Sequence, residues 1–175
     1  MKDIDILCVG EVLVDFIGHQ TGVLINNTRD YHRYLGGSPA NVAMNSARLG
    51  LKSVMVATVG NDGFGEYIFE RLNEVGVNTN HVKTIKNKPT SVIFVSRTDS
   101  TPDFIPFRKA DSYIREDQIS KELLSKSTIF HTTCFALSKK PAQPTLLRQA
   151  EEAFNLGCKL SIDVNYAKKL WSSQD

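Results

Sequence analysis

A pair of glycines followed by a helix start carries the strongest chemical signal in the chain. Gly36 and Gly37 have no Cβ atom, so the backbone can approach a small ligand closely at this point. The helix predicted from Ser38 presents unpaired N–H groups there, and Asn41 in its first turn can both donate and accept a hydrogen bond. Because each hydroxyl of a vicinal diol is also both donor and acceptor, the pattern predicts a site for a small polyol. The alternative is a plain strand-to-helix turn with Asn41 in solvent.

A carboxylate between apolar neighbours supports the polyol site. Asp15 follows Val14 and precedes Phe16 in a segment with the composition of a strand. Burying a carboxylate is costly unless hydrogen-bond donors surround it, and two sugar hydroxyls would serve as donors. The alternative is an aspartate at a strand end that local backbone or water satisfies, since aspartates are mostly exposed. We predict that Asp15 converges with Gly37 and Asn41.

Short apolar strands alternate with helices along most of the chain, and this alternation predicts the architecture. The predicted strands are residues 4–9, 53–59, 127–133 and 159–163. One helix is expected to have Ser38 as its N-cap and to stop at Gly50. A second should be capped by Asp62 and stop at Gly76, and a third should span residues 144–156. This order predicts an α/β fold with a Rossmann-like, mainly parallel sheet flanked by helices on both faces.

Two β-rich regions interrupt that alternation. Residues 11–35 and 90–108 contain strand-like segments and turn-forming residues without intervening helices. They predict a small antiparallel sheet, inserted in the α/β core, that serves as a lid or a partner surface. A plain extension of the main sheet edge is the alternative.

Composition and charge exclude several classes of function. The 175 residues, 41% apolar and 23% charged, are typical of one globular domain. A formal net charge of +2 with scattered lysines and arginines disfavours a nucleic-acid partner. Glu11 and Asp15 interrupt the N-terminal apolar segment, and no apolar run approaches the ~20 residues of a membrane helix. We therefore expect a cytoplasmic protein with no membrane partner.

Together these motifs resemble the ribokinase-like (PfkB-type) carbohydrate kinases. The segment from Gly10 to Asp15, the segment from Gly36 to Gly50 and the segment from Val59 to Gly65 occur in the order of that family. The resemblance covers nearly the whole of residues 1–175 and implies a mainly parallel sheet with a small β lid over a sugar. It also implies ATP as cosubstrate, Mg²⁺ on the ATP phosphates and a homodimer formed through the lid. A monovalent cation is left open.

The resemblance assigns sugar contacts residue by residue. Asp15, Gly37 and Asn41 match the contacts to sugar hydroxyls, and Gly36 matches the turn that lets these contacts converge. Arg108 resembles a basic residue that fructokinase-like members place after the last lid strand, which makes it a candidate substrate contact. A solvated turn arginine is the alternative.

A second group of residues resembles the nucleotide side of the site. Asp163 and Asn165 match an Asp-x-Asn motif that faces the phosphates and the metal in sugar kinases. They follow a predicted strand, and open α/β sheets bind ligands at the carboxyl ends of their strands. No other metal ligand set is predicted.

Departures from the family pattern narrow the expected sugar. Leu13 and Ser38 stand where ribokinases tend to carry Asn and Lys, and Leu170-Trp171 is more similar to fructokinases. Ala167 stands where fructokinases often have Arg. We expect the acceptor substrate to be a ketohexose rather than ribose. 2-Keto-3-deoxygluconate and a nucleoside are less favoured candidates.

The catalytic half of the family's chemistry is not found in the sequence. A late Gly-Ala-Gly-Asp motif supplies the anion hole and the base in this family, and the 175 residues contain no Gly-x-Gly-Asp. We therefore expect an N-terminal portion that binds sugar, lacks the C-terminal part of the family fold, holds no catalytic residue and is inactive alone. The alternative is a non-catalytic sugar-binding or regulatory module. A dehydrogenase domain is disfavoured because no Gly-x-Gly-x-x-Gly follows the first strand.

Overall fold

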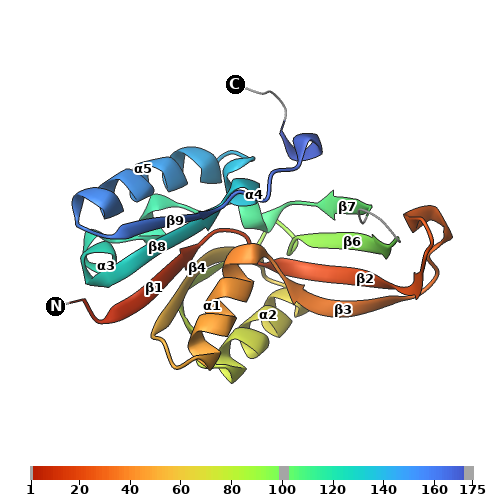
Figure 1. Cartoon of the computed structure of the whole chain (residues 1–175), viewed down its shortest axis with the longest axis horizontal. Coiled ribbons are helices and arrows are strands. Elements are labelled where there is room, and N and C mark those ends of the chain that lie inside the picture. The colour runs from red at the N-terminus through yellow and green to blue at the C-terminus, as the bar shows by residue number, and fades with distance from the viewer. Residues whose placement is uncertain (1, 99–102, 172–175) are drawn as a thin grey trace.

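A five-stranded sheet with all neighbouring strands parallel forms the centre of the molecule (Figure 1). The computed structural model describes residues 2–98 and 103–171. In spatial order the strands are β5 (Asn78–Ile85), β4 (Ser53–Gly60), β1 (Ile4–Val9), β8 (Ser127–Thr133) and β9 (Lys159–Asp163). The four predicted strands are confirmed to within one residue at each end. Strand β5 was not predicted, because its sequence NTNHVKTI is largely polar and it forms an edge of the sheet.

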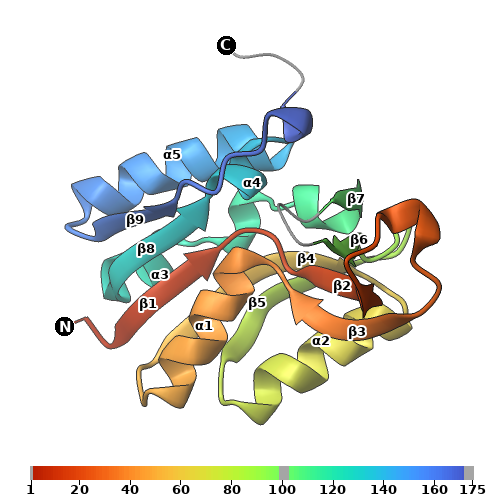
Figure 2. The same cartoon turned by 45° about the vertical axis from the view of Figure 1, so that its right-hand side comes forward.

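Helices cover both faces of this sheet, as predicted. The helices are α1 (Ser38–Arg48), α2 (Gly63–Glu74), α3 (Lys121–Lys126), α4 (Cys134–Leu137) and α5 (Ala142–Asn155). Figure 2 shows α1 and α2 on one face and α3 and α5 on the other. Along β1 the side chains alternate between the two cores: Ile6 and Cys8 join the first, and Leu7 and Val9 join the second.

Helix ends follow the local sequence signals with two corrections. Asp62 caps α2, accepting hydrogen bonds from Phe64 N at 3.1 Å and Gly65 N at 3.0 Å. The N-cap of α1 is Gly37, not Ser38, because the φ of +100° at this residue makes the turn into the helix. Helix α5 begins at Ala142, two residues before the prediction, since a helix tolerates Pro144 in its first turn.

The predicted lid is a separate four-stranded sheet that projects from the carboxyl ends of the central strands (Figure 1). Its strands, in spatial order, are β3 (Tyr31–Gly36), β2 (Leu13–Thr21), β6 (Val92–Arg97) and β7 (Phe104–Phe107). The expected antiparallel pairing is confirmed for β2–β3 and β6–β7, but β2 and β6 pair in parallel, so the small sheet is mixed. Strand β2 follows β1, and β6 follows β5. Because β1 and β5 run in the same direction, β2 and β6 both leave the carboxyl ends of the main sheet in that direction.

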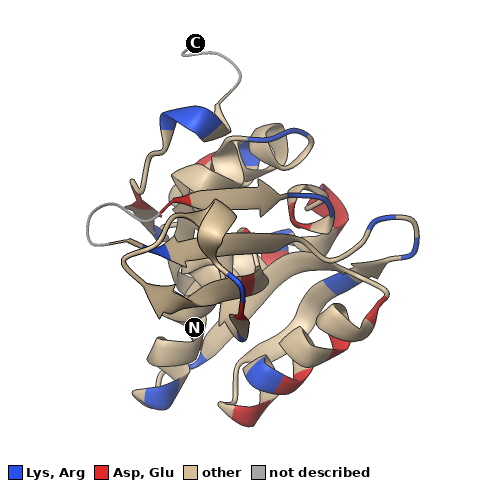
Figure 3. Ribbon diagram, turned by 90° about the vertical axis from the view of Figure 1, so that its right-hand side faces the viewer, with Lys and Arg blue, Asp and Glu red and all other residues tan. Residues whose placement is uncertain are grey.

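Aromatic contacts fix the lid to the core. The Phe16 ring stacks on Phe94 of the neighbouring lid strand with centroids 5.0 Å apart and meets Phe64 of α2 edge-on at 5.6 Å. Short 3-10 helices complete the described chain: η1 (Ile25–Asn27), η2 (Ala110–Ser112), η3 (Glu116–Gln118) and η4 (Lys168–Leu170). Basic and acidic segments are interspersed over the side seen in Figure 3. Over residues 2–98 and 103–171, no helix has the length and apolar character needed to cross a membrane.

Candidate functional site

A cavity of about 440 Å³ lies between the lid and the carboxyl ends of the central strands. The structure places five of the predicted site residues in its wall: Asp15, Gly37, Asn41, Asp163 and Asn165. Its other lining residues come from both sheets, the β1–β2 connection, the start of α1 and the segments that follow β8 and β9: Glu11, Leu13, Ser38, Ile93, Val95, Phe104, Thr133, Phe135, Ala167 and Leu170. Residues from both ends of the sequence therefore share one concave site.

Asp15 and Gly36 fit together only because Gly36 has no side chain. Asp15 lies on β2 beside β3, and a Cβ atom added to Gly36 would lie 2.3 Å from Asp15 Oδ2. Burial raises the pKa of Asp15 to about 6. In the described part of the chain no group donates a hydrogen bond to this carboxylate, so the cavity contains a partly buried acceptor that needs a donor.

The turn at Gly37 brings the start of α1 to the same cavity. Its φ is +100°, and a Cβ atom here would lie 2.4 Å from the carbonyl oxygen of Glu11. Asn41 N donates to Gly37 O at 3.0 Å, which fixes the first turn of the helix. The Asn41 carboxamide is exposed at the cavity and has no hydrogen-bond partner within residues 2–98 and 103–171. It is free to bind a hydroxyl group.

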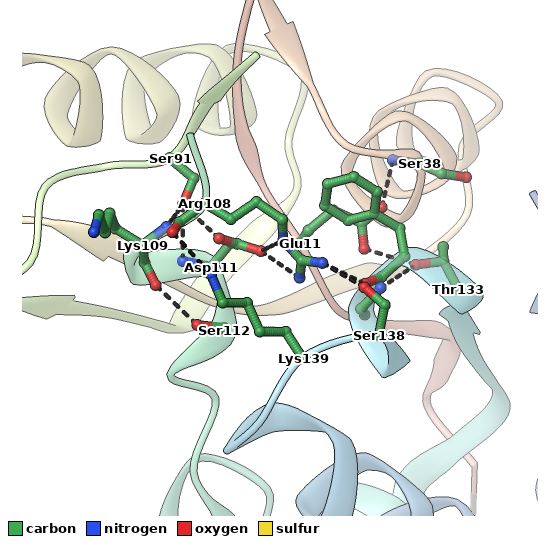
Figure 4. Close-up of polar contacts among 12 residues, drawn as sticks. Glu11, Ser38, Ser91, Arg108, Lys109, Asp111, Ser112, Thr133, Ser138 and Lys139 are labelled. Carbon is green, nitrogen blue, oxygen red and sulfur yellow. Dashed lines mark hydrogen bonds and ion pairs between the residues drawn. The ribbon is translucent and has the colours of Figure 1, made fainter. Parts of the chain in front are cut away.

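Glu11 is a site residue that sequence reasoning did not identify. It is 2% exposed, its Oε1 accepts from Ser38 N at 3.2 Å and its Oε2 accepts from Thr133 Oγ1 at 2.7 Å (Figure 4). Burial raises the pKa of Glu11 to about 7, although these two hydrogen bonds act to lower it. The carboxylate therefore joins the start of α1 to the end of β8 beneath the cavity. The sequence signal that could have identified Glu11 is the position of its carboxylate next to Gly10, between two apolar segments.

Asp163, at the end of β9, is hydrogen-bonded to Ser38, the residue whose backbone N–H also binds Glu11. Ser38 Oγ donates to Asp163 Oδ2 at 2.5 Å, and Asn165 N donates to Asp163 Oδ1 at 3.0 Å. The first bond links two residues that are 125 positions apart in the sequence. Asp163 is thus placed by the fold next to the helix start that carries Asn41.

Arg108 is not among the residues that line this cavity. Its guanidinium forms a buried ion pair with Asp111, with Nε at 2.8 Å and Nη2 at 2.7 Å from Oδ2 (Figure 4). Nη1 donates to Phe135 O at 2.9 Å and to Ser138 Oγ at 2.5 Å. The solvated turn arginine is also excluded, because the residue is 7% exposed. Asp111, three residues further on, draws the side chain away from solvent and from the Asp15 cavity.

Metal-binding groups are sparse in the described chain. No group of three or more His, Cys, Asp and Glu side chains in residues 2–98 and 103–171 could hold a metal ion. Asp163 offers one carboxylate at the cavity, which suits a metal that is held mainly by the phosphates of a nucleotide.

A family model and a curated relative match nearly the whole chain. A model of the "pfkB family carbohydrate kinase" matches residues 3–175. An ATP-dependent 6-phosphofructokinase of Thermoanaerobacterium thermosaccharolyticum is 34% identical over 170 residues, which is 97% of this chain and 52% of that protein. The chain thus spans about half the length of this curated relative.

Solved structures agree in fold. The fructokinase of Halothermothrix orenii superposes with a TM-score of 0.92 at 34% identity, covering 98% of this chain and 61% of that chain. An uncharacterized sugar kinase from Pyrococcus horikoshii, in complex with ATP, gives a TM-score of 0.90 at 29% identity, covering 97% and 56%. The family match over nearly every residue, together with this fold, shows that the chain belongs to the pfkB family of carbohydrate kinases.

Proposed function

We propose that this chain binds the acceptor sugar of an ATP-dependent carbohydrate kinase with a ketohexose, fructose-like substrate. The observation that carries the proposal is the Asp15 carboxylate, which is partly buried, lacks a donor in the described chain and shares a cavity with the Asn41 carboxamide. The relatives named fructokinase and 6-phosphofructokinase support a fructose-like acceptor.

The proposed sugar contacts follow from hydrogen-bond chemistry. An ionised Asp15 accepts only, so it binds the hydrogens of one or two hydroxyl groups. The Asn41 side chain donates and accepts, so it can hold the neighbouring hydroxyl in either orientation. Gly36 and Gly37 leave room for the ring to approach the backbone. This arrangement selects adjacent alcohols rather than an apolar ligand.

We assign Asp163 and Asn165 to the nucleotide side of the site. Both lie at the carboxyl end of β9, where α/β sheets bind ligands, and one structural relative has been solved with ATP. Mg²⁺, when bound to the ATP phosphates, would neutralise part of their charge. Asp163 would contact that metal through a carboxylate that Ser38 already orients. A monovalent cation remains a prediction without a site.

We further propose that the 175 residues bind sugar but do not transfer a phosphoryl group alone, since they contain no Gly-x-Gly-Asp. A sugar-binding or regulatory module is the second candidate, and it predicts the same binding without any dependence on ATP. A homodimer through the lid is proposed from exposed apolar side chains on its strands, Tyr34, Ile105 and Phe107. The cytoplasmic location stays a prediction.

Calorimetric titration of the chain with fructose, ribose and 2-keto-3-deoxygluconate tests the sugar site. We expect fructose to bind. Asp15→Asn and Asn41→Ala should each lower the affinity for fructose by about tenfold or more, which is the effect expected from losing one charged or two neutral hydrogen bonds. Asn45→Ala, one turn further along α1 and outside this cavity, is the matched control and should bind fructose normally. Equal affinity in all variants would refute the site. Robust turnover with ATP would refute the proposed inactivity.

A further inference from the structure

Two histidines lie side by side on the lid, and neither lines the proposed sugar site. His19 is near the end of β2 and His32 near the start of β3, so both belong to the hairpin end that projects away from the central sheet (Figure 1). Their ring centroids are 4.8 Å apart, and the angle between the ring planes is 52°. Both side chains are exposed, and neither ring has a hydrogen-bond partner within residues 2–98 and 103–171. Their ring nitrogens are therefore available to a ligand.

Strand pairing holds both imidazoles on one face of the lid. Ile17 pairs with His32, so His32 lies on the face that carries Ile17 and Asp15, since alternate side chains of a strand share a face. The ring contact places His19 on this face as well. The opposite face is covered, because Phe16 packs there against α2. The two imidazoles therefore point away from α2 and are open to a second molecule.

The spacing of the two rings suits a shared transition-metal ion. Zn²⁺ binds imidazole nitrogen at about 2.0–2.1 Å with tetrahedral angles, so two imidazoles on one ion have their centroids about 5 Å apart. The observed separation is 4.8 Å. Imidazole suits Zn²⁺, whereas Mg²⁺ prefers oxygen ligands. The pair therefore has the geometry of a two-nitrogen chelate for Zn²⁺ and differs in ligand type from the nucleotide side of the site.

One chain supplies only half of such a site. No group of three or more His, Cys, Asp and Glu side chains in the described ranges could hold a metal ion. The Asp30 carboxylate on the same hairpin already accepts from Gln20 Nε2 at 2.8 Å. A structural Zn²⁺ site takes four ligands from protein. The missing two must come from another molecule.

A second copy of the chain can supply the missing ligands. Tyr34 is 50% exposed, and its ring centroid lies 6.5 Å from that of His32, so an aromatic surface adjoins the imidazoles. In a two-fold contact the same patch meets itself, and each copy then presents the same two imidazoles to an ion on the axis. Four imidazoles would complete the tetrahedral set.

We propose that His19 and His32 of two copies of this chain together bind one Zn²⁺ ion, which joins the two lids. The inference goes beyond the proposed sugar site, because neither histidine lines that cavity. It uses the lid contact proposed above and adds a metal to it. Because the ion binds only the paired form with four ligands, it strengthens the association of the lids by mass action.

Calorimetric titration of the chain with ZnCl₂, followed by light scattering, tests the proposal. We expect about one Zn²⁺ for every two chains, which is the ratio that a shared four-ligand site requires. The weight-average mass should rise when Zn²⁺ is added and fall again with EDTA. One ion per chain without a rise in mass would show that water completes a site in each copy, and it would overturn the shared site. Absence of Zn²⁺ binding would also overturn the proposal.

Single substitutions make the test specific to the two histidines. His19→Gln and His32→Gln should each abolish the rise in mass with Zn²⁺. His81→Gln is the matched control and should keep the rise, because it removes an imidazole whose Nδ1 is already 3.0 Å from Gln118 O. A rise that survives both lid substitutions would assign the metal to other groups and overturn the proposal. Fructose binding should be unchanged in both lid variants, so a failure of the metal site and a failure of the sugar site are distinguishable.

Discussion

Glu11 shows how one buried carboxyl group can couple this site to pH. The fold places it at 2% exposure between Ser38 N and Thr133 Oγ1, where burial raises its pKa from 4.5 to about 7, and the nearby charge of Asp111 acts in the same direction. The folded protein therefore holds this proton more tightly than the unfolded chain. Its stabilising effect is complete below about pH 4.5 and is lost as pH rises through about 7. Asp15 adds to this trend, since burial raises its pKa from 3.8 to about 6.

We expect Glu11→Gln to flatten this dependence of stability on pH. The amide oxygen can still accept from Ser38 N and its NH2 group can face Thr133 Oγ1, but no charge is buried at high pH. Between about pH 5 and pH 8, Glu11 should account for a loss on the order of 2–3 kcal/mol of unfolding free energy in the unmodified chain, and the variant should lack this part of the loss. Urea unfolding followed by circular dichroism at several pH values measures both slopes. Equal slopes would show that Glu11 does not carry the effect.

The sequence predicted the site residues whose local context is unusual. It missed residues whose role depends on contacts with distant parts of the chain. Asp15 and Asn41 stand out because each is a polar group in an unusual local context, and the structure brings both to one cavity. Glu11 acquires its role from Thr133, which is 122 residues away, and Ser38 acquires its role from Asp163. Arg108 does not line that cavity because it pairs with Asp111, and no spacing rule shows this ion pair in advance.

At the level of elements, the junction of β4, α2 and the lid depends on a close backbone contact. A Cβ atom added to Gly65 would lie 2.2 Å from Gly60 O, and Asp62 beside it accepts from Thr90 N at 2.8 Å and Thr90 Oγ1 at 2.7 Å. Burial acts to raise the pKa of Asp62, but these bonds and the two from α2 amides outweigh it and lower the pKa. The base of β6 is thereby attached to the start of α2.

We expect Gly65→Ala to destabilise the chain and Gly63→Ala to leave it unchanged or slightly more stable. The added methyl group at Gly65 meets backbone atoms that cannot turn aside, so α2 must shift, at a cost of about 2–3 kcal/mol. Gly63 lies in the same helix with nothing within 4 Å of an added Cβ, and alanine there removes up to about 1 kcal/mol of helix penalty. Denaturant midpoints compare the pair. A Gly65→Ala midpoint at or above that of Gly63→Ala would contradict the contact.

Element prediction succeeded where periodicity and end signals agreed. Strand β1 and strand β9 match their predicted bounds residue for residue, because charged or turn residues mark the ends of both segments. The parallel β2–β6 pair of the lid was not predictable in the same way, since it depends on the direction in which two separate hairpins leave the main sheet. Strand pairing of this kind is set by tertiary topology and not by local sequence.

At the scale of the whole molecule, two groups of exposed apolar side chains in the described part of the chain lie on or next to strands. One is the lid, with Tyr34, Ile105 and Phe107 at 50%, 43% and 53% exposure. The other is the edge strand β9 and the segment after it, with Leu160, Ile162 and Val164 at 50%, 49% and 65%. The second group combines apolar side chains with the unpaired backbone groups of a sheet edge, which is a template for pairing with another chain.

We therefore expect this chain to self-associate at micromolar concentration through the β9 edge, in addition to the contact proposed for the lid. Leu160→Lys combined with Ile162→Lys should lower the weight-average mass measured by light scattering, because two ammonium groups at a sheet edge oppose pairing. Phe107→Lys tests the lid separately, and Leu51→Lys, at an exposed side chain between α1 and β4 that belongs to neither group, is the control. A monomeric mass for the unmodified chain would contradict the prediction. A drop in mass only with Phe107→Lys would assign association to the lid, because charge on that surface would then be the change that separates the subunits.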